Sequence, residues 1–343
     1  MTRHSDRVKT FSVGFGEDRY NELSYAAEAA RHFGTKHHEL VVAHRDVVER
    51  LPALVAFRDA PVSEPSDIPI HMLACEAAKS VKMVLTGEGS DELLGGYPKH
   101  VAEQFAHGYQ LLPGVVRHRL IAPLAQALPY NFHRVKTAVT NLNTEDWHER
   151  YVRWFGALNC AERENLTVLR ANGSRYPAGP PFDGDPGNST LRSMLYFDQT
   201  SWLPDNLLER GDRMTMAASI EARVPFLDHK LAEYVSSLPD RFRVRGLRSK
   251  WILREAGRKL IPARILWRRK VGFRVPVNQW FRREMRDFLS DHLQGNSSLT
   301  RCYYDGAVLD RVLAEHVGGR QNSEKLLWSL LNLEIWHRTY AGH

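Results

Sequence analysis

A glycine-rich turn that carries three acidic residues is the most chemically suggestive stretch of the sequence. The residues VLTGEGSDELLGGY run from Val84 to Tyr97 and include Glu88, Asp91 and Glu92. Backbone N–H groups of such a turn, placed after a parallel strand, can bind phosphate. Carboxylates beside a phosphate repel it unless a divalent cation lies between them. Asp91 and Glu92 therefore predict Mg²⁺ bound to a phosphate chain.

Helix capping gives a second explanation of the same acids. Ser90 could cap a helix whose first turn carries Asp91 and Glu92, which is a common stabilising pattern. No Walker-type lysine follows the glycines, so the turn is not an ordinary P-loop. The spacing of these residues leaves both explanations open.

Two later stretches combine charge with helical patterning. An apolar helix is predicted within 201–229, and its charges could form either a functional site or a structural network. These charged residues are Asp212, Arg213, Glu221 and Arg223. Lys250 opens a second predicted helix, in RGLRSKWILREA. A lysine at a helix N-terminus favours anions, although an exposed lysine is the ordinary alternative.

Composition indicates a soluble globular protein in a reducing, cytoplasmic setting. The 343 residues can form one large domain or two ordinary ones, with 43% hydrophobic and 25% charged residues. No apolar run approaches a membrane span, and the N-terminus resembles no signal or transit peptide. The cysteines Cys75, Cys160 and Cys302 show no disulfide or metal spacing.

Basic residues are concentrated between residues 241 and 274. This range holds thirteen Lys and Arg against one acid, Glu255, within a chain of net charge +7. Such a stretch attracts phosphate on a nucleotide or on nucleic acid, or forms a solvated basic face.

The first hundred residues alternate between strand and helix patterns. The predicted strands are Val8–Phe15, His38–Val42 and Val81–Leu85, and the predicted helices are Asn21–Phe33, Val47–Phe57 and Pro69–Lys79. This alternation implies an α/β layer with a parallel sheet over 1–100. Strand signals stop after Tyr97, so 101–343 is predicted to be mainly helical, with a surface loop near 171–190.

A series of motifs resembles the synthetase domain of the glutamine-dependent asparagine synthetases. In family order these are TFSVGF, GTKHHEL, LTGEGSDELLGGY, LPDNLLERGDRMTMAASIEARVPFLDH, SKWILREA, KVGFRVPVNQW and SEKLLWSLLNLEIW. The resemblance covers nearly the whole chain and is weakest from about 101 to 190. It implies a parallel sheet of the adenine nucleotide alpha-hydrolase-like (PP-loop) type.

The resemblance also implies a reaction. In this family ATP adenylates the side-chain carboxylate of aspartate, and ammonia derived from glutamine then displaces AMP to give asparagine. ATP and Mg²⁺ are the implied cofactors. Aspartate and ammonia are the implied small-molecule substrates, and neither nucleic acid nor membrane is an expected partner.

Individual residues take roles by matching the family motifs. Asp91 matches the acid that holds Mg²⁺, with Glu92 beside it, and Lys250 matches a lysine that stabilises phosphate charge. The positions expected near the nucleotide are Val13, Thr86, Gly87, Gly89 and Ser90. Glu88 fits a proton acceptor for ammonia. Arg223 is a candidate for binding the substrate carboxylate, positioned by Glu221.

Two family parts are not found in these residues. The glutaminase domain requires a cysteine after the initiator methionine, whereas residue 2 is Thr2. The pyrophosphate loop, SGG-x-DS, occurs nowhere in the chain. The strand that leads into that loop is expected between the TFSVGF and KMVLTG strands. We therefore expect a truncated or partial copy, a split gene or an internal start codon, with a separate glutaminase subunit or upstream fragment as partner.

The expected loss of a central strand affects stability as well as chemistry. Unpaired backbone groups on the flanking strands cost about 1–3 kcal/mol each if dry. The isolated chain is therefore predicted to be poorly stable or inactive. Three alternatives stay open: a related adenylating synthetase of the β-lactam or peptide-cyclising type, a degenerate non-catalytic protein, and a basic nucleic-acid binder.

Overall fold

The structure is a computed structural model of the 343-residue chain. It describes residues 7–17, 21–128, 132–155, 158, 160–168, 189–268 and 272–340. The predicted surface loop at 171–190 lies outside the described residues, apart from Ser189 and Thr190. Ser189 caps the following helix, because its Oγ accepts the backbone N–H of Arg192 at 3.1 Å.

The N-terminal elements follow the predicted strand and helix alternation. They are β1 (Lys9–Phe15), α1 (Leu23–Phe33), β2 (Lys36–Val42), α2 (His44–Arg58), α3 (Asp67–Ala78) and β3 (Met83–Leu85). β1 and β2 are parallel, with Lys9 opposite Lys36 and Phe15 opposite Val42. Pro52 lies inside α2 and does not end it. The predicted α/β layer with parallel strands is confirmed.

A fourth strand, β4 (Glu221–Arg223), corrects the sequence interpretation. It pairs in parallel with β3, so that Met83 is opposite Glu221 and Leu85 is opposite Arg223. The predictions that strands stop after Tyr97 and that Glu221 and Arg223 lie on a helix are therefore wrong. Three residues are too few to show a periodicity of two in the sequence, and only the pairing partner makes them a strand.

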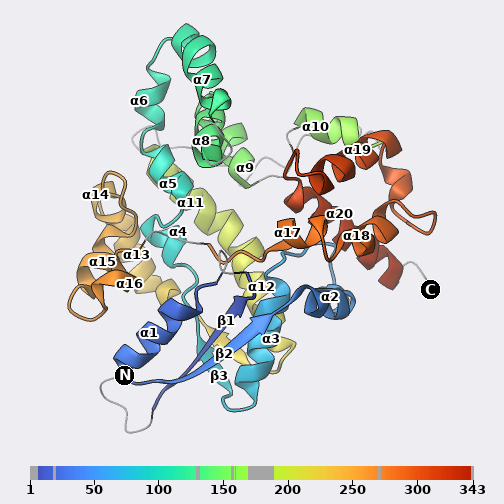
Figure 1. Ribbon diagram of the computed structural model, residues 1–343. Coiled ribbons are helices and arrows are strands. Elements are labelled where there is room, and N and C mark those ends of the chain that lie inside the picture. Colours follow the sequence, from blue (N-terminus) through green and yellow to red (C-terminus); the bar gives the residue numbers. More distant parts are fainter. Residues whose placement is uncertain are drawn as a thin grey trace.

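The four strands form two separate two-stranded sheets. Within the described residues, β1 pairs with β2 and β3 pairs with β4, and no ladder joins the two pairs. Phe11 of β1 and Val84 of β3 pack against one buried cluster, which includes Ala74 and Ala77 of α3 (Figure 1). The described strands are thus divided into two pairs, and the family resemblance implies a further strand between β1 and β3.

The rest of the described chain is mainly helical, as predicted. The elements up to residue 208 are α4 (Ser90–Leu94), α5 (Pro98–Glu103), α6 (Ala106–Gln110), η2 (Val116–Ile121), α7 (Ala122–Ala127), α8 (His133–Leu142), α9 (Trp147–Phe155), α10 (Cys160–Leu166), α11 (Thr190–Phe197) and η4 (Asp198–Leu208). Later elements are α12 (Glu209–Met216), η5 (Pro225–Leu227), α13 (His229–Ser237), α14 (Asp240–Arg243), α15 (Trp251–Gly257), α16 (Ala263–Leu266), α17 (Val277–Arg282), α18 (Arg286–Leu293), η6 (Arg301–Tyr303), α19 (Gly306–Val317) and α20 (Glu324–Tyr340). No described helix is long and apolar enough to cross a membrane.

The main hydrophobic core joins the two ends of the chain. Phe15 and Val42, at the ends of β1 and β2, belong to the same buried cluster as Trp280, Trp328 and Leu331 of the C-terminal helices. The α/β layer therefore shares its core with α17–α20. The predicted boundary near residue 100 marks a change in secondary structure, and the packing continues across it.

Glu334 of α20 is a buried carboxylate that holds the Ser298–Thr300 turn. It accepts the backbone N–H groups of Leu299 (3.0 Å) and Thr300 (2.9 Å) and pairs with Arg338 at 2.7 Å. Burial by itself raises the pKa of Glu334, but these hydrogen bonds outweigh it and lower the pKa to about 2.

We predict that Glu334→Gln destabilises the protein at pH 7 by about 1–3 kcal/mol. The folded-state pKa lies below its ordinary value of 4.5. The stabilisation is therefore complete above about pH 4.5 and is lost as the pH falls toward 2. Urea unfolding of both proteins between pH 3 and 7 measures this. Glu284→Gln, at an exposed position, is the matched control. A difference in unfolding free energy that stays constant with pH would contradict the assignment.

Candidate active site

The glycine-rich turn after β3 begins the candidate site. β3 ends at Leu85, and the Thr86 N–H continues the ladder by donating to the Arg223 carbonyl at 2.9 Å. Gly89 has φ +83°, and a Cβ there would lie 2.3 Å from Leu227 Cδ2, so only glycine fits. Gly89 is also the N-cap of α4, whereas the Ser90 hydroxyl donates to the Gly87 carbonyl at 2.8 Å. The interpretation of Ser90 as the helix cap is therefore wrong.

Lys250 closes over this turn. Its Nζ lies 2.9 Å from Asp91 Oδ1 and 2.9 Å from Ser90 Oγ. Gly96 packs against this ion pair, because a Cβ there would meet Asp91 Oδ1 at 1.7 Å and Lys250 Cε at 2.3 Å. The structure thus brings together two residues that the sequence predicted for one phosphate site, and both side chains are largely buried.

The backbone of Lys250 is strained. Its φ of 52° and ψ of 40° are left-handed, and it is the N-cap of α15. This conformation costs a lysine about 1–2 kcal/mol. The preceding residue is held by Arg254, whose Nε donates to the Ser249 carbonyl at 2.9 Å. Strain of this kind persists where the surrounding structure enforces it, often at functional positions.

Glu92, the second predicted metal ligand, is enclosed by other protein groups. Its side chain is 1% exposed, and a short hydrogen bond from the Tyr97 hydroxyl occupies its Oε1. Burial also raises the pKa of Glu92. Among the described residues, no group of three or more His, Cys, Asp or Glu side chains could hold a metal. Mg²⁺ bound mainly by phosphate and water needs only one or two carboxylates, so Asp91 alone fits that ion.

Glu88 faces α12 rather than Asp91. A Cβ on Gly211 would lie 3.0 Å from Glu88 Oε2 and 3.3 Å from Oε1, so the carboxylate rests on the helix backbone. Burial raises the pKa of Glu88, and the positive charge of Arg210 opposes that shift. The Thr86 hydroxyl is 3.4 Å from Glu88 Oε2.

Arg210 and Gly211 are site residues that the sequence analysis missed. Arg210 donates to Asn206 Oδ1 at 3.1 Å, which holds its guanidinium on η4 and α12. The available signal was a glycine inside a predicted apolar helix, which often marks a close approach of another group. Nothing in the sequence indicated that the approaching group is Glu88.

The other predicted residues, Arg223, Glu221 and Val13, have different surroundings. Arg223 reaches the turn through its backbone, but its side chain pairs with Glu221 at 2.8 Å, and the two side chains are 62% and 57% exposed. An exposed pair of this kind contributes little to stability. Val13 is not next to the turn: it lies on β1, opposite Leu40 of β2, whereas the turn follows β3 of the second sheet.

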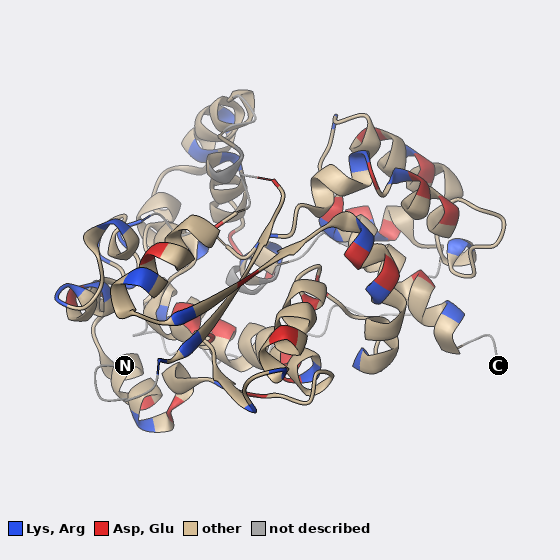
Figure 2. Ribbon diagram, turned by 60° about the horizontal axis from the view of Figure 1, so that its bottom comes forward, with Lys and Arg blue, Asp and Glu red and all other residues tan. Residues whose placement is uncertain are grey.

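The basic stretch is partly used in packing. Arg245 and Arg248 lie over the Trp251 ring, with Cζ 4.9 and 5.9 Å from its centroid, and Arg264 and Arg268 lie over the ring of Tyr25. Figure 2 shows Lys and Arg gathered at this side of the molecule, over α14–α16. These cation–π contacts account for several of the charges without a nucleic-acid partner.

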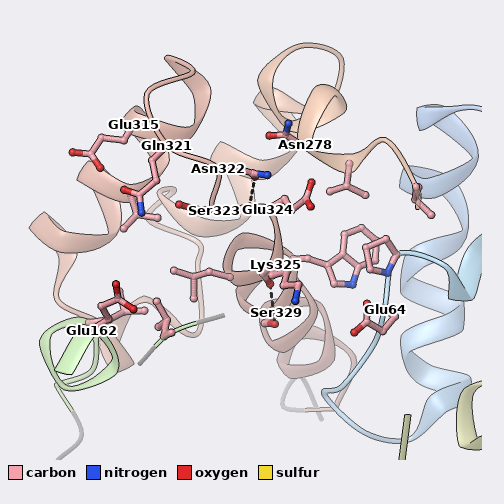
Figure 3. Close-up of a pocket in the computed structure, with 18 of the residues that line it drawn as sticks. Glu64, Glu162, Asn278, Glu315, Gln321, Asn322, Ser323, Glu324, Lys325 and Ser329 are labelled. Atoms are coloured by element: carbon pink, nitrogen blue, oxygen red, sulfur yellow. Dashed lines mark hydrogen bonds between the residues drawn. The ribbon is translucent and has the colours of Figure 1, made fainter. Parts of the chain in front are cut away.

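A cavity of about 860 Å³ lies between the loop after α2 and helices α10, α17, α19 and α20. Figure 3 shows Lys325 near its centre, with Glu64 and Glu162 on opposite sides. Glu64 also accepts a hydrogen bond from Asn206 Nδ2 at 3.3 Å, and Asn206 in turn accepts from Arg210. The cavity is therefore linked to the Glu88 side of the site through η4, and its size suits a small molecule.

Comparison with known proteins identifies the family. The asparagine synthase family model matches residues 1–338. A Mycobacterium tuberculosis protein named "Putative asparagine synthetase (glutamine-hydrolyzing)" is 32% identical, over 99% of this chain and 52% of its own length. Asparagine synthetase (glutamine-hydrolyzing) 1 of Bacillus subtilis is 29% identical, over 96% of this chain and 52% of its own length.

More distant similarity extends to proteins with other names. The amidase chyE of Penicillium rubens is 27% identical over 80% of this chain and 44% of its own length. The chain spans about half the length of the curated asparagine synthetases that it matches. The chain belongs to the asparagine synthase family.

Proposed function

We propose that the chain is the synthetase part of an ATP-dependent amide ligase. A carboxylate attacks the α-phosphorus of ATP, and the acyl-adenylate forms as pyrophosphate leaves. Ammonia then adds to the acyl carbon and AMP leaves, giving the amide. The observation that carries the proposal is the pairing of Lys250 with Asp91 on the turn after β3, at 2.9 Å. Family membership supports aspartate as the acceptor and asparagine as the product.

The two sides of the turn suit the two half-reactions. Lys250 supplies positive charge for the phosphate as negative charge builds during adenylation. The N–H groups of residues 87–90, at the carboxyl end of β3, are the proposed donors to phosphate oxygens. Mg²⁺, when bound at Asp91, would neutralise phosphate charge. We place this nucleotide site on a PP-loop-type sheet, with the adenine near Val13.

Glu88 is the proposed proton acceptor for the second step. Ammonia becomes cationic as it adds to the acyl carbon, and a carboxylate beside it can take the proton. Burial raises the pKa of Glu88 toward the working range of a base, while Arg210 favours the ionised form. Glu88 lies on the α12 side of the turn, so it can act on the amine without competing for the metal.

Arg223 and Glu221 are proposed to bind the acceptor after their mutual ion pair opens. Their side chains are exposed at the edge where β3 and β4 end. A guanidinium released from Glu221 can bind a carboxylate through two parallel hydrogen bonds.

A related synthetase with another acceptor is the second candidate. The similarity to amidase chyE supports it, because that relative carries a different name from the asparagine synthetases. Asparagine formed from aspartate, with no amide from other acids, would favour the first candidate. Equal product from several acids would favour the second. Each assay is run with and without an added polypeptide segment that contains SGG-x-DS. We propose that the pyrophosphate loop and the glutaminase are supplied from outside these residues.

Lys250→Ala is expected to reduce aspartate-dependent ATP–pyrophosphate exchange by a factor on the order of 100 or more, because the adenylation charge loses its counter-ion. Lys230→Ala, an exposed lysine on α13, is the matched control and should leave exchange unchanged. Retention of wild-type exchange by Lys250→Ala would rule out the proposed adenylation site.

Gly211→Ala tests the role of Glu88. The new methyl group would lie about 3.0 Å from Glu88 Oε2, so it should displace the carboxylate. We expect amide formation to fall roughly tenfold or more, with pyrophosphate exchange retained, because proton removal belongs only to the second step. Gly108→Ala, which has open space at its Cβ, is the control. A parallel loss of both activities would contradict this division of roles.

A further inference from the structure

We propose that Tyr97 is a positioning residue for the metal-binding carboxylate, held in place by a buried polar cluster. This Tyr97 cluster consists of Glu92, Tyr97, Lys99, His100 and Asp198. The inference rests on the proposed function, because it takes Asp91 as the residue that holds Mg²⁺. None of the five side chains was assigned this task by the sequence.

Asp198 anchors the cluster. It is fully buried at the start of η4, with Oδ1 2.7 Å from Lys99 Nζ and Oδ2 2.6 Å from His100 Nε2. Lys99 also lies over the Phe155 ring, 3.3 Å from its centroid. Both oxygens of this carboxylate thus hold residues of α5, and a buried charge with two such partners is fixed in place.

His100 connects Asp198 to the backbone of Tyr97. The Tyr97 backbone N–H donates to His100 Nδ1 at 3.2 Å, so Nδ1 carries no proton. The imidazole proton therefore lies on Nε2 and points to Asp198. Since His100 is fully buried, the Tyr97 backbone has one defined place relative to η4.

The Tyr97 hydroxyl then fixes the residue next to Asp91. It donates a short hydrogen bond to Glu92 Oε1, and Gln199 Nε2 donates to the Glu92 backbone carbonyl at 3.1 Å. Glu92 is thereby held by its side chain and by its backbone, from two different elements. Its neighbour Asp91 is kept facing Lys250. Contacts to a residue next to a metal ligand restrict the ligand's position through the backbone, much as outer-shell hydrogen bonds to the ligand itself do.

Asp198 is also connected to the Glu88 side of the site. Asp198 begins η4, an 11-residue π-helical run that leads directly into α12. π-helical geometry is frequent at functional sites. Because α12 carries Arg210 and Gly211 beside Glu88 and directly follows η4, Asp198 links the metal side of the turn to the amine side.

Tyr97→Phe tests the proposal with little change of shape. Calorimetric titration of the full chain compares MgATP with ATP in excess EDTA. We expect the variant to bind MgATP about tenfold more weakly, as loss of an outer-shell partner does, and to bind metal-free ATP like the wild type. Tyr109→Phe removes a comparable hydroxyl, which donates to Asn143 Oδ1 at 2.9 Å, and should change neither affinity.

The outcomes separate the inference from the proposed function. If the wild-type chain binds neither MgATP nor metal-free ATP, the proposed function and the positioning role of Tyr97 are both wrong. If the wild type and Tyr97→Phe bind MgATP equally well, the positioning role of Tyr97 is wrong and the proposed function is unaffected. Equal weakening of both forms would also overturn it, because a merely structural hydroxyl would act on the whole nucleotide site.

Glu92→Gln provides a second variant should Tyr97→Phe fail to fold. The amide keeps an oxygen for the Tyr97 hydroxyl, so its loss of MgATP affinity should not exceed about tenfold. Asp91→Asn should remove the difference between MgATP and metal-free ATP altogether. If Glu92→Gln also removed that difference, Glu92 would be a ligand and the inference would be wrong.

Discussion

The ion pair between Asp91 and Lys250 is the contact on which the candidate site depends. It joins a turn after β3 to the start of α15, far apart in the chain, and it requires close backbone approach. Gly96 permits that approach because any Cβ there would overlap both side chains. Lys250 adopts a left-handed conformation to reach the turn. The attraction of two largely buried charges, which are screened less than surface charges, helps to offset this backbone strain.

Buried polar groups hold together the helices that surround the candidate site. Asp198 and His100 are fully buried and paired with each other. Arg58 pairs with Asp67 at 2.9 Å and with Glu209 at 2.6 Å, beneath the helix that carries Arg210. Each such group is costly if left unpaired, so these networks fix one arrangement of α3, α5 and α12. Precision at the turn therefore comes from polar contacts rather than from the hydrophobic core alone.

The divided sheet sets a different constraint. Phe11 of β1 and Val84 of β3 pack on one buried cluster with Ala74 and Ala77 of α3, although the two strand pairs form separate ladders in the described part of the chain. The glycine-rich turn follows β3, whereas Val13, the residue proposed to lie near the adenine, is on β1. The binding of any ligand that contacts both the turn and Val13 therefore depends on the relative position of β1 and β3.

The sequence by itself determined the α/β layer, the helical remainder and the grouping of Asp91 with Lys250. Local periodicity is enough for long elements, and the motifs around the turn and around Lys250 are specific. Only the tertiary structure decided that Glu221–Arg223 form a strand, because a three-residue strand exists through its partner. It also decided that Glu92 is enclosed by Tyr97 and that Glu88 faces Gly211. The direction of a side chain depends on which distant element covers it, and neighbouring acids in one turn carry no local signal of that difference.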